Sequence, residues 1–421
     1  MTSICFYFQV HQPYRIKKHR VFDIGKDHEY FNDKSDSNLN NEKILLKVAS
    51  KSYIPANQLF LKLLKKHHEL KISFSFSGVF LDQLEEFSPE VLMSFQELAR
   101  TGQVEILSET YYHSLSFLYS KEEFKKQVEK HARKIKKIFS MTPTVFRNTE
   151  LIYNDDLAQE VEKMGYKGIL AEGWDNILEW RSPNFLYKPP NTKKIKLLLK
   201  NYKLSDDIAF RFSNKGWEEH PLFAPKFSQW VNATNGNGNV VNLFMDYETF
   251  GEHQWEDTGI FNFLEKLPVE LLKNPDNNFV TPSEALEKYN TVGELGMPNF
   301  VSWADVERDL SAWLSNSIQQ DALEKIYNME QEVFNTKDVD IIEDWRRLQT
   351  SDHFYYMCTK WFNDGDVHKY FSPYASPYEA FITYMNVVND LKYRIEIINK
   401  KKSSNCNFLR VLPKITSTDF V

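Results

Sequence analysis

Short apolar runs recur along this chain, and each ends in polar residues that lead into a helical pattern. In the clearest case, residues 240–251, Val-Val-Asn-Leu-Phe-Met is followed by Asp-Tyr-Glu-Thr-Phe-Gly. An apolar run of this kind predicts a strand buried on both sides, as in a parallel sheet. Because the active sites of α/β barrels lie at the carboxyl ends of strands, Asp246 and Glu248 predict an active-site edge. The alternative is a loop in which Asp246 caps the next helix.

This order of strand, polar edge and helix occurs seven times, which predicts a parallel α/β barrel or a doubly wound sheet. The predicted strands begin at residues 4, 72, 103, 143, 167, 195 and 240. After about residue 300, helical periodicity predicts a C-terminal bundle over 321–334, 340–362 and 377–400. We therefore expect a catalytic barrel at 1–295, a helical domain at 296–400 that completes the cleft, and a tail at 401–421.

Composition narrows the choice of partners. The 421 residues carry 52 basic and 58 acidic side chains, a net charge of -6, so there is no basic surplus for binding nucleic acid. The N-terminus shows no signal-peptide pattern, and no apolar run is long enough to cross a membrane. Cys5, Cys358 and Cys406 match no metal motif and are expected to be reduced thiols. We expect a cytoplasmic enzyme that binds neither nucleic acid nor a membrane.

Carboxylates gather at the ends of the predicted strands. Glu109 follows the third strand, Glu150 the fourth and Asp246 the seventh. Two carboxyl groups that face each other across an aromatic-lined cleft can hydrolyse a glycosidic bond, because an ionised one attacks the anomeric carbon and a protonated one releases the leaving sugar. Aromatic residues make up 15% of the chain, enough to line such a cleft as well as fill a core. His11, which ends the first strand, either faces the same pocket or is a structural hydrogen bonder.

Metal chemistry is the rival interpretation. His11, His113 and the carboxylates are residue types that bind metals. The chain has no His-x-x-x-His or His-Glu-x-x-His spacing, no glycine-rich phosphate loop and no Gly-x-Ser-x-Gly sequence. We therefore expect no metal and no other cofactor. A metal-dependent carbohydrate deacetylase or a mannosidase-like enzyme stays as an alternative.

Four short motifs give the chain a resemblance to glycoside hydrolase family 57, α-amylase type. They stand in that family's order: His11-Gln12-Pro13; Gly-Gln-Val-Glu-Ile-Leu at 102–107 with His113; Phe-Arg-Asn-Thr-Glu at 146–150; and Met-Asp-Tyr-Glu-Thr-Phe-Gly at 245–251. A fifth family region is expected around Asp305 to Trp313. The resemblance covers nearly the whole chain. It implies a (β/α)7 incomplete TIM-like barrel followed by a C-terminal helical bundle, and retaining cleavage of α-1,4 bonds in starch-like or glycogen-like glucans.

The resemblance also implies roles for single residues. Glu150 matches the family's nucleophile and Asp246 its general acid/base, whose carboxyl groups lie about 5–5.5 Å apart in a retaining enzyme. Arg147-Asn148-Thr149 departs from the Trp-containing form of some members, which puts the sugar contacts there in question. The other substrate-binding candidates match by motif or by position, with simple packing as the alternative for the tryptophans and His253: His11, Glu105, Glu248, His113, Trp174, His253, Trp255 and Trp303.

Other activities stay open at this stage. A 4-α-glucanotransferase or an α-glucan branching enzyme of the same family would pass the covalent intermediate to a sugar instead of to water. A non-catalytic α-glucan-binding protein is an alternative from another class. Asp352 and His353, in the predicted helical region, either complete the cleft or form a buried structural pair.

Overall fold

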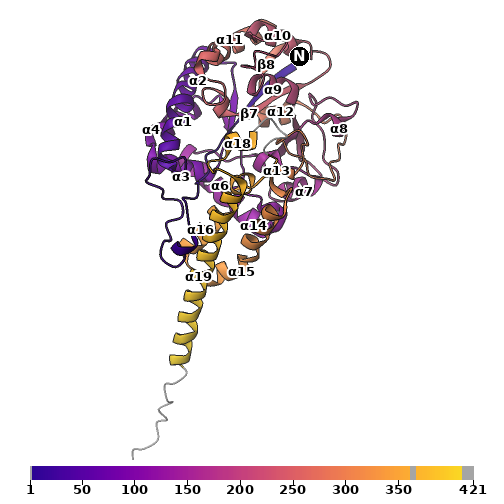
Figure 1. Cartoon of the computed structure of the whole chain (residues 1–421). Coiled ribbons are helices and arrows are strands. Elements are labelled where there is room, and N and C mark those ends of the chain that lie inside the picture. The colour runs from indigo at the N-terminus through magenta and orange to yellow at the C-terminus, as the bar shows by residue number, and fades with distance from the viewer. Residues whose placement is uncertain (1, 361–366, 410–421) are drawn as a thin grey trace, which may run out of the picture.

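The computed structural model describes residues 2–360 and 367–409, with the side chains of 2–360 and 368–400. Within this part the strands form two parallel sheets surrounded by helices (Figure 1). The strands are β1 (Thr2–Val10), β2 (Ile72–Phe76), β3 (Val104–Ile106), β4 (Val145–Phe146), β5 (Gly168–Glu172), β6 (Lys196–Lys200), β7 (Val240–Asp246) and β8 (Asn277–Phe279). All seven predicted strands are present, and each begins within two residues of its expected start.

β1 is the centre of the larger sheet, which has the order β3-β2-β1-β7, and β8 pairs with the start of β1. Phe8 of β1 lies beside Phe74 of β2 on one side and Met245 of β7 on the other. Every residue of β1 is buried, and in β7 the first residue that is not fully buried is Asp246. The apolar runs are therefore strands covered on both faces, as the sequence predicts.

The second sheet has the order β4-β5-β6, and backbone hydrogen bonds link it to the first sheet at both edges. The Ser108 N–H donates to the Val145 carbonyl at 3.0 Å, and the Arg147 N–H donates to the Ser108 carbonyl at 2.8 Å. At the other edge the Asn201 N–H donates to the Asn242 carbonyl at 2.9 Å. Because all strand pairs are parallel, the carboxyl ends of the strands share one side of the molecule.

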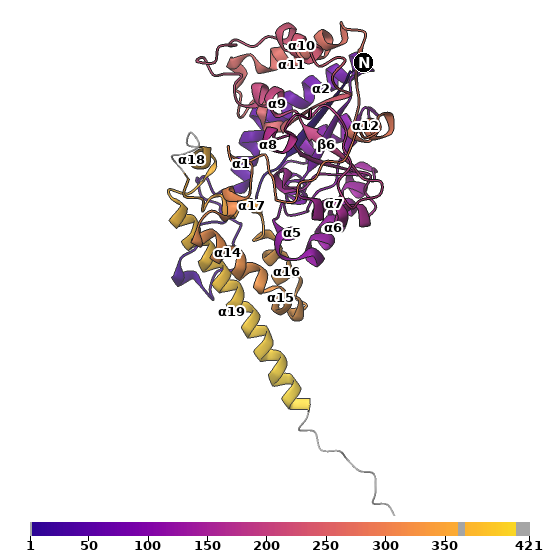
Figure 2. The ribbon, with the colours of Figure 1, turned by 90° about the vertical axis from the view of Figure 1, so that its right-hand side faces the viewer.

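Helices connect the strands, and polar caps mark several of their starts. Ser120 and Asn154 accept hydrogen bonds from the first turns of α6 and α7, and Pro55 lies in the first turn of α2. Figure 2 shows α10 and α11 side by side at one end of the molecule. The helices of this part are α1 (Asn41–Val48), α2 (Ile54–Lys66), α3 (Gly78–Phe87), α4 (Pro89–Ala99), α5 (Ser116–Tyr119), α6 (Lys121–Phe139), α7 (Asp155–Lys163), α8 (Asp175–Leu178), α9 (Tyr202–Ala209), α10 (Ala224–Asn232), α11 (Ile260–Leu272) and α12 (Pro282–Lys288).

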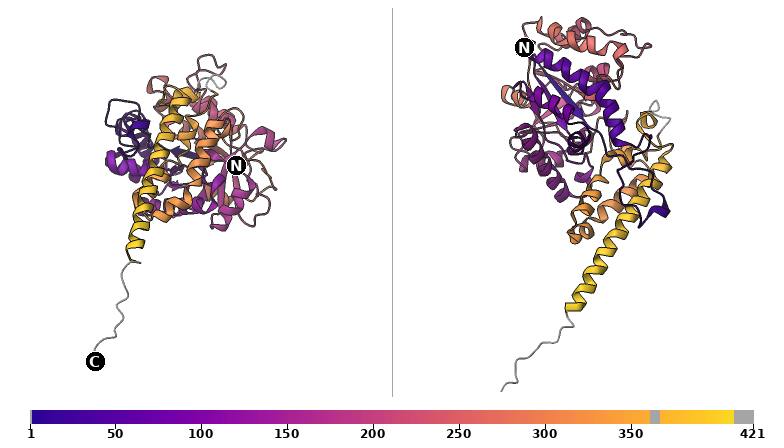
Figure 3. Two further views of the ribbon diagram at one scale, coloured as in Figure 1. Left: turned by 60° about the horizontal axis from the view of Figure 1, so that its bottom comes forward. Right: turned by 90° about the vertical axis from the view of Figure 1, so that its left-hand side faces the viewer.

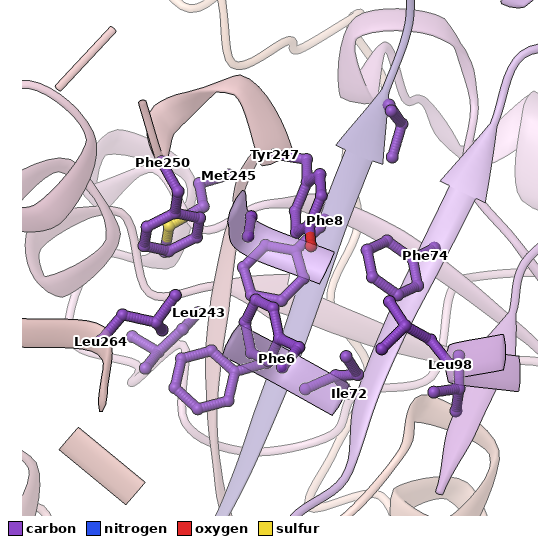
Figure 4. Close-up of a cluster of buried hydrophobic side chains, with 14 of the residues drawn as sticks. Phe6, Phe8, Ile72, Phe74, Leu98, Leu243, Met245, Tyr247, Phe250 and Leu264 are labelled. Carbon is purple, nitrogen blue, oxygen red and sulfur yellow. The ribbon is translucent and has the colours of Figure 1, made fainter. Parts of the chain in front are cut away.

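Aromatic rings fill the core between the larger sheet and its helices (Figure 4). The Phe8 ring packs on Phe74 and Tyr247, with centroids 5.7 and 5.5 Å away. The buried Tyr247 hydroxyl donates to the Asn57 side chain at 2.7 Å, so its polar atom has a partner. Since Tyr247 stands between Asp246 and Glu248 in the chain, this packing fixes the edge of β7.

Beyond residue 300, the described chain is mainly helical. α19 packs along α14, α15 and α16, and its far end extends away from the rest of the molecule (Figures 1 and 3). A hydrophobic cluster between these helices buries Trp313 and Trp345, together with Ile16 and Tyr30 from the N-terminal segment 14–50. The helices are α13 (Ser311–Leu314), α14 (Ser317–Asn328), α15 (Glu330–Thr336), α16 (Val339–Arg347), α17 (Ser351–Tyr355), α18 (Val367–Phe371) and α19 (Pro377–Leu409).

The structure refines the predictions for this C-terminal part. The pattern over 340–362 predicts one helix, but α16 and α17 are separate because Thr350 leaves the helical path with a ψ of 128°. The N–H of Ser351, the first residue of α17, then donates to the His113 carbonyl at 2.9 Å. α19 continues to Leu409, past the limit expected at residue 400. Cys5 and Cys358 are buried free thiols, whereas the Cys406 side chain lies outside the described side chains. None of the described helices has the length and apolar character needed to span a membrane.

Candidate active site

A cavity of about 790 Å³ opens at the carboxyl ends of the strands. This volume lies within the roughly 300–1,000 Å³ that small-molecule sites occupy. Both halves of the chain line it, because strand ends and the C-terminal segments meet here. The polar and aromatic residues that line it include His11, His113, Arg147, Glu150, Trp174, Lys200, Asp206, Asp246, Glu248, His253, Trp303, Arg308 and Asp352.

Glu150 lies directly after β4, in the short turn η3 (Thr149–Leu151), with a backbone φ of 56°. A left-handed φ costs a non-glycine residue about 1–2 kcal/mol, and such strain concentrates at functional sites. Two donors hold the carboxylate: His113 Nε2 donates to Oε1 at 3.0 Å, and Trp303 Nε1 donates to Oε2 at 2.7 Å. The Glu150 backbone carbonyl also accepts from the Trp303 N–H at 3.2 Å.

His113 bridges two carboxylates. Its Nδ1 faces Glu109 at 3.1 Å while Nε2 faces Glu150, so both ring nitrogens donate and the ring is a histidinium. Burial opposes the charge, but the hydrogen bonds to Glu109 and Glu150 outweigh burial and raise the pKa of His113 to about 9. Burial also opposes the carboxylate charges, yet His113 lowers the pKa of Glu109 to about 2 and holds the pKa of Glu150 below its usual value. Glu150 is therefore ionised and fixed in orientation.

The pKa of Asp246 is shifted in the opposite direction from that of Glu150. Burial and then the nearby charge of Glu150 raise the pKa of Asp246 to about 6. Burial and the charge of Asp246 raise the pKa of Glu248 to about 8, and the Tyr53 hydroxyl donates a hydrogen bond to Glu248. At mildly acidic pH the cavity therefore holds an ionised Glu150 beside a protonated Asp246.

His11 lies against His113, the residue that donates to Glu150. Its ring stacks on His113, with centroids 3.9 Å apart and 19° between the ring planes. His11 Nε2 lies 3.0 Å from Asp352 Oδ2, and Nδ1 lies 2.6 Å from the Ser77 hydroxyl. Burial and the positive charge of His113 lower the pKa of His11, so the neutral ring donates to Asp352 and accepts from Ser77. Burial opposes the Asp352 charge, but His11 holds the pKa of Asp352 well below its usual value.

One group in the described part of the chain has metal-ligand chemistry. The ligand atoms of His11, His113 and Asp352 lie within 4.8 Å of one another. His113, however, uses both ring nitrogens as donors to Glu109 and Glu150, so coordination would cost it a proton and a buried ion pair. This donor set does not fit a metal ion, and we assign none to it.

Residues 5–298 match the family model described as Glycosyl hydrolase family 57. The chain belongs to this family. A protein of Methanocaldococcus jannaschii that is provisionally named an alpha-amylase is 41% identical over 415 residues, which cover 96% of this chain and 87% of that protein.

Solved structures of family 57 share the fold. The branching enzyme of Pyrococcus horikoshii has a TM-score of 0.65 at 17% identity, over 88% of this chain and 87% of that one. An alpha-amylase of Thermotoga maritima has a TM-score of 0.60 at 13% identity, over 100% of both chains. Membership of family 57 makes this protein a glycoside hydrolase with an α/β fold, as the sequence motifs imply.

Most residues predicted from the family 57 motifs meet in one place. Eight of the ten line the cavity, although they come from segments that are far apart in the chain. The family's fifth region also reaches it, because Asp305 and Trp313 are both lining residues. The eight are His11, His113, Glu150, Trp174, Asp246, Glu248, His253 and Trp303.

Two predicted substrate-binding residues lie elsewhere. Glu105 accepts hydrogen bonds from the N–H and the hydroxyl of Ser283, both at 2.9 Å, and so caps the start of α12 outside the cavity. Trp255 is 58% exposed, also outside the cavity, with the Lys51 ammonium 5.6 Å from its ring. For both residues the substrate-binding role stays a prediction. Glu109, four residues after Glu105, is the carboxylate that contacts the site through His113.

Asp352 and His353, for which the sequence left two roles open, lie in different surroundings. Asp352 reaches the cavity, whereas His353 is buried and donates to the Arg347 carbonyl. Three further lining residues, Arg147, Lys200 and Asp206, were not among the candidates. Arg147 is fully buried, with its guanidinium 4.9 Å from the centre of the Trp303 ring. Lys200 ends β6 and Asp206 follows it, so the signal of a polar edge at the end of a strand could have identified both.

Proposed function

We propose that this protein is a retaining α-amylase-type hydrolase of α-1,4-linked glucans. The observation that carries the proposal is the pair of carboxyl groups with opposite protonation in one cavity. Glu150 is held ionised by His113 and Trp303, whereas burial and the Glu150 charge keep a proton on Asp246 up to a pH of about 6. The likeness to the Methanocaldococcus jannaschii protein supports the same activity.

In the proposed reaction a Glu150 oxygen attacks the anomeric carbon, and Asp246 gives its proton to the glycosidic oxygen as that bond breaks. Asp246, now a carboxylate, then takes a proton from water, and the hydroxide attacks the glucosyl–Glu150 ester with net retention. One donor binds each carboxylate oxygen of Glu150, and the two hydrogen bonds fix the orientation of the carboxylate for the attack. The carboxyl separation of about 5–5.5 Å follows from retention and stays a prediction.

The fold supports this assignment in its finer details. We propose that the two linked sheets together form the (β/α)7 barrel, with residues 296–400 as a helical domain that completes the cleft. Trp174 and His253 line the cavity and are proposed to bind glucose units, with Trp174 stacking on a sugar face. The polymer is proposed to be an intracellular starch-like or glycogen-like α-glucan.

Product analysis on a maltooligosaccharide of defined length tests the proposal, with wild type beside Glu150→Gln. Shorter products only, released first in the α configuration and absent with Glu150→Gln, are the expected result. Glu150→Gln keeps the side-chain shape but removes the nucleophilic charge, so turnover should fall by at least about 10⁴-fold while thermal unfolding stays cooperative. Full activity in Glu150→Gln, or cleavage in both proteins with inversion, would contradict the assignment.

A glucan transferase is the second candidate, and the likeness in fold to the Pyrococcus horikoshii branching enzyme favours it. In that case a sugar hydroxyl captures the glucosyl-enzyme, and the same assay gives products both longer and shorter than the substrate. Binding of the oligosaccharide without any turnover by wild type would instead favour a binding protein that has lost catalysis.

A further inference from the structure

The loop at 302–309 brings the Trp303 indole to Glu150. Its backbone closes on itself, because the Ser302 N–H donates to the Arg308 carbonyl at 3.0 Å and the Ser302 hydroxyl donates to the Asp309 carbonyl at 2.8 Å. Asp305 and Arg308 hold left-handed φ values of 54° and 53°, a strain of about 1–2 kcal/mol for each residue. Such a loop keeps its shape only if other contacts determine it.

Arg308 supplies those contacts. Its Nη1 donates to the Trp303 carbonyl at 2.7 Å and to Glu172 Oε2 at 2.8 Å, and its Nη2 donates to Asp206 Oδ2 at 3.0 Å. Lys200 Nζ completes the cluster, 2.9 Å from Asp206 Oδ1 and 3.6 Å from Glu172. Two cations and two anions balance, and the four side chains are between 0% and 13% exposed.

This cluster connects the loop to the strands that form the floor of the site. Glu172 and Lys200 are the last residues of β5 and β6, and Asp206 lies on α9. Arg308 therefore joins the backbone of Trp303 to the end of β5 and to α9, and Lys200 adds the end of β6 to the cluster through Asp206 and Glu172. Lys200 and Arg147 also lie over the Trp303 ring, 5.4 and 4.9 Å from its centre, which adds cation–π attraction to the placement of the indole.

We infer that Arg308, through the cluster with Glu172, Lys200 and Asp206, is a positioning residue that holds the Trp303 indole on the nucleophile. The chain of contacts is continuous: strand ends, Arg308, the Trp303 backbone, the indole N–H and the Glu150 carboxylate. Loss of Arg308 would leave Glu172 and Asp206 facing each other with only Lys200 to balance them, so the loop would shift. Glu150 would then lose a donor that favours its ionised form. The inference rests on the proposed role of Glu150.

Arg308→Met tests the inference through kinetics on the maltooligosaccharide. We expect a fall in kcat of roughly ten- to hundredfold, the worth of one hydrogen bond to a charged group. The acid limb of the pH–rate profile should move to higher pH, because the carboxylate takes up its proton more readily without the indole N–H. The double variant with Trp303→Phe should lose no more than Trp303→Phe alone, since both changes remove the same bond.

The control is Arg346→Met, which removes a buried, bidentate ion pair with Glu123 at 2.8 and 3.0 Å between α16 and α6. It should lower thermal stability and leave the acid limb in place. If Arg308→Met raises only KM, Arg308 acts on the sugar directly and the inference is wrong. The same holds if the fall in kcat of the double variant equals the combined falls of Arg308→Met and Trp303→Phe. If Arg308→Met does not fold, Arg308→Lys is measured instead. A single ammonium cannot reach all three acceptors at once, so the same shift in the acid limb, at reduced size, is expected.

A crystal structure of the Arg308 variant separates failure of the inference from failure of the proposed function. The indole nitrogen should lie beyond hydrogen-bond distance of Glu150, whereas an unchanged 2.7 Å bond would overturn the inference. This readout holds even if the wild type leaves every α-glucan intact, a result that would contradict only the proposed function.

Discussion

Glu150 is held by side chains that the sequence separates widely. His113 precedes it by 37 residues and Trp303 follows it by 153. Each donor favours the anion, while burial works against it, and the balance keeps the pKa of Glu150 low in a cavity where Asp246 keeps its proton. The difference between these two carboxyl groups comes from their donors, since both lie in the same cavity.

The pH dependence of kcat/KM follows from these groups. Activity should fall as pH rises through about 6, where Asp246 loses its proton, and should fall at low pH as Glu150 is protonated. In His113→Gln the donor to Glu150 is neutral, so the pKa of Glu150 rises and the acid limb moves to higher pH. The active range should then narrow from its acid side.

A pH–rate series on wild type and His113→Gln measures both limbs. His68→Gln, at an exposed residue on the connection after α2, is the control and should leave the profile unchanged. An acid limb at the same pH in His113→Gln would show that the histidinium does not set the ionisation of Glu150.

At the scale of elements, β7 and the turn after it carry Asp246, the proposed general acid, and Glu248. Asp246 ends the strand, Glu248 lies in the turn η4 (Tyr247–Thr249), and Gly251 turns the chain with a φ of 110°. A Cβ at Gly251 would lie 2.0 Å from the Lys51 carbonyl oxygen, so the chain approaches η2 (Ala49–Tyr53) too closely for any side chain.

Gly251→Ala should therefore destabilise the protein by roughly 2 kcal/mol or more, because strain at positive φ adds to the clash with Lys51. It should also lower kcat, since the turn that carries Glu248 must move. Gly259→Ala is the matched control: its φ of 82° imposes the strain, but no atom lies within 4 Å of the new Cβ, so a cost of about 1 kcal/mol is expected. Urea unfolding measures both, and equal losses would contradict the packing explanation.

The elements themselves were largely predictable from the sequence. Alternation of apolar runs and capped helices identified seven of the eight described strands, because strands buried on both faces leave a continuous apolar run, whereas β8 has only three residues. In the motif that contains Glu105 and Glu109, the sequence does not show which carboxylate contacts the site, because both residues precede His113. The three-dimensional structure shows that His113 binds Glu109, whereas Glu105 binds Ser283. Arg308 could not be predicted, since its partners Glu172 and Asp206 lie far away in sequence and no local spacing reports such a contact. For Asp352 the sequence left two roles open, because its partner His11 is equally remote in the chain.

At the scale of the whole molecule, the N-terminal segment is bound to the C-terminal helices. Asp390, fully buried on α19, accepts hydrogen bonds from the Gly25 N–H, from His28 Nδ1 at 2.7 Å and from the Tyr30 hydroxyl. These contacts attach the N-terminal segment to α19. The same segment also contacts α17, because the Phe31 ring stacks on His353 with centroids 6.5 Å apart.

Asp390→Asn should loosen this closure. An amide offers one acceptor oxygen in place of two, so one of the three donors loses its partner at a cost of roughly 1–3 kcal/mol. Limited trypsin digestion should then cut faster at the lysines of segment 14–50. Asp321→Asn, which breaks an exposed pair with Lys325 at 2.6 Å on α14, should change neither the digestion nor the unfolding midpoint appreciably. Identical digestion of the two variants would mean that Asp390 does not hold the segment.

The origin of Trp303 and Asp352 in the later part of the chain has a consequence for biosynthesis. A ribosome makes the strands and Glu150 first, and several seconds or more pass before residue 352 is added at roughly 5–20 residues per second. Until then Glu150 lacks its indole donor, and His11 lacks its carboxylate partner. A nascent chain therefore cannot form the complete cavity, and the site is assembled only once translation has passed Asp352.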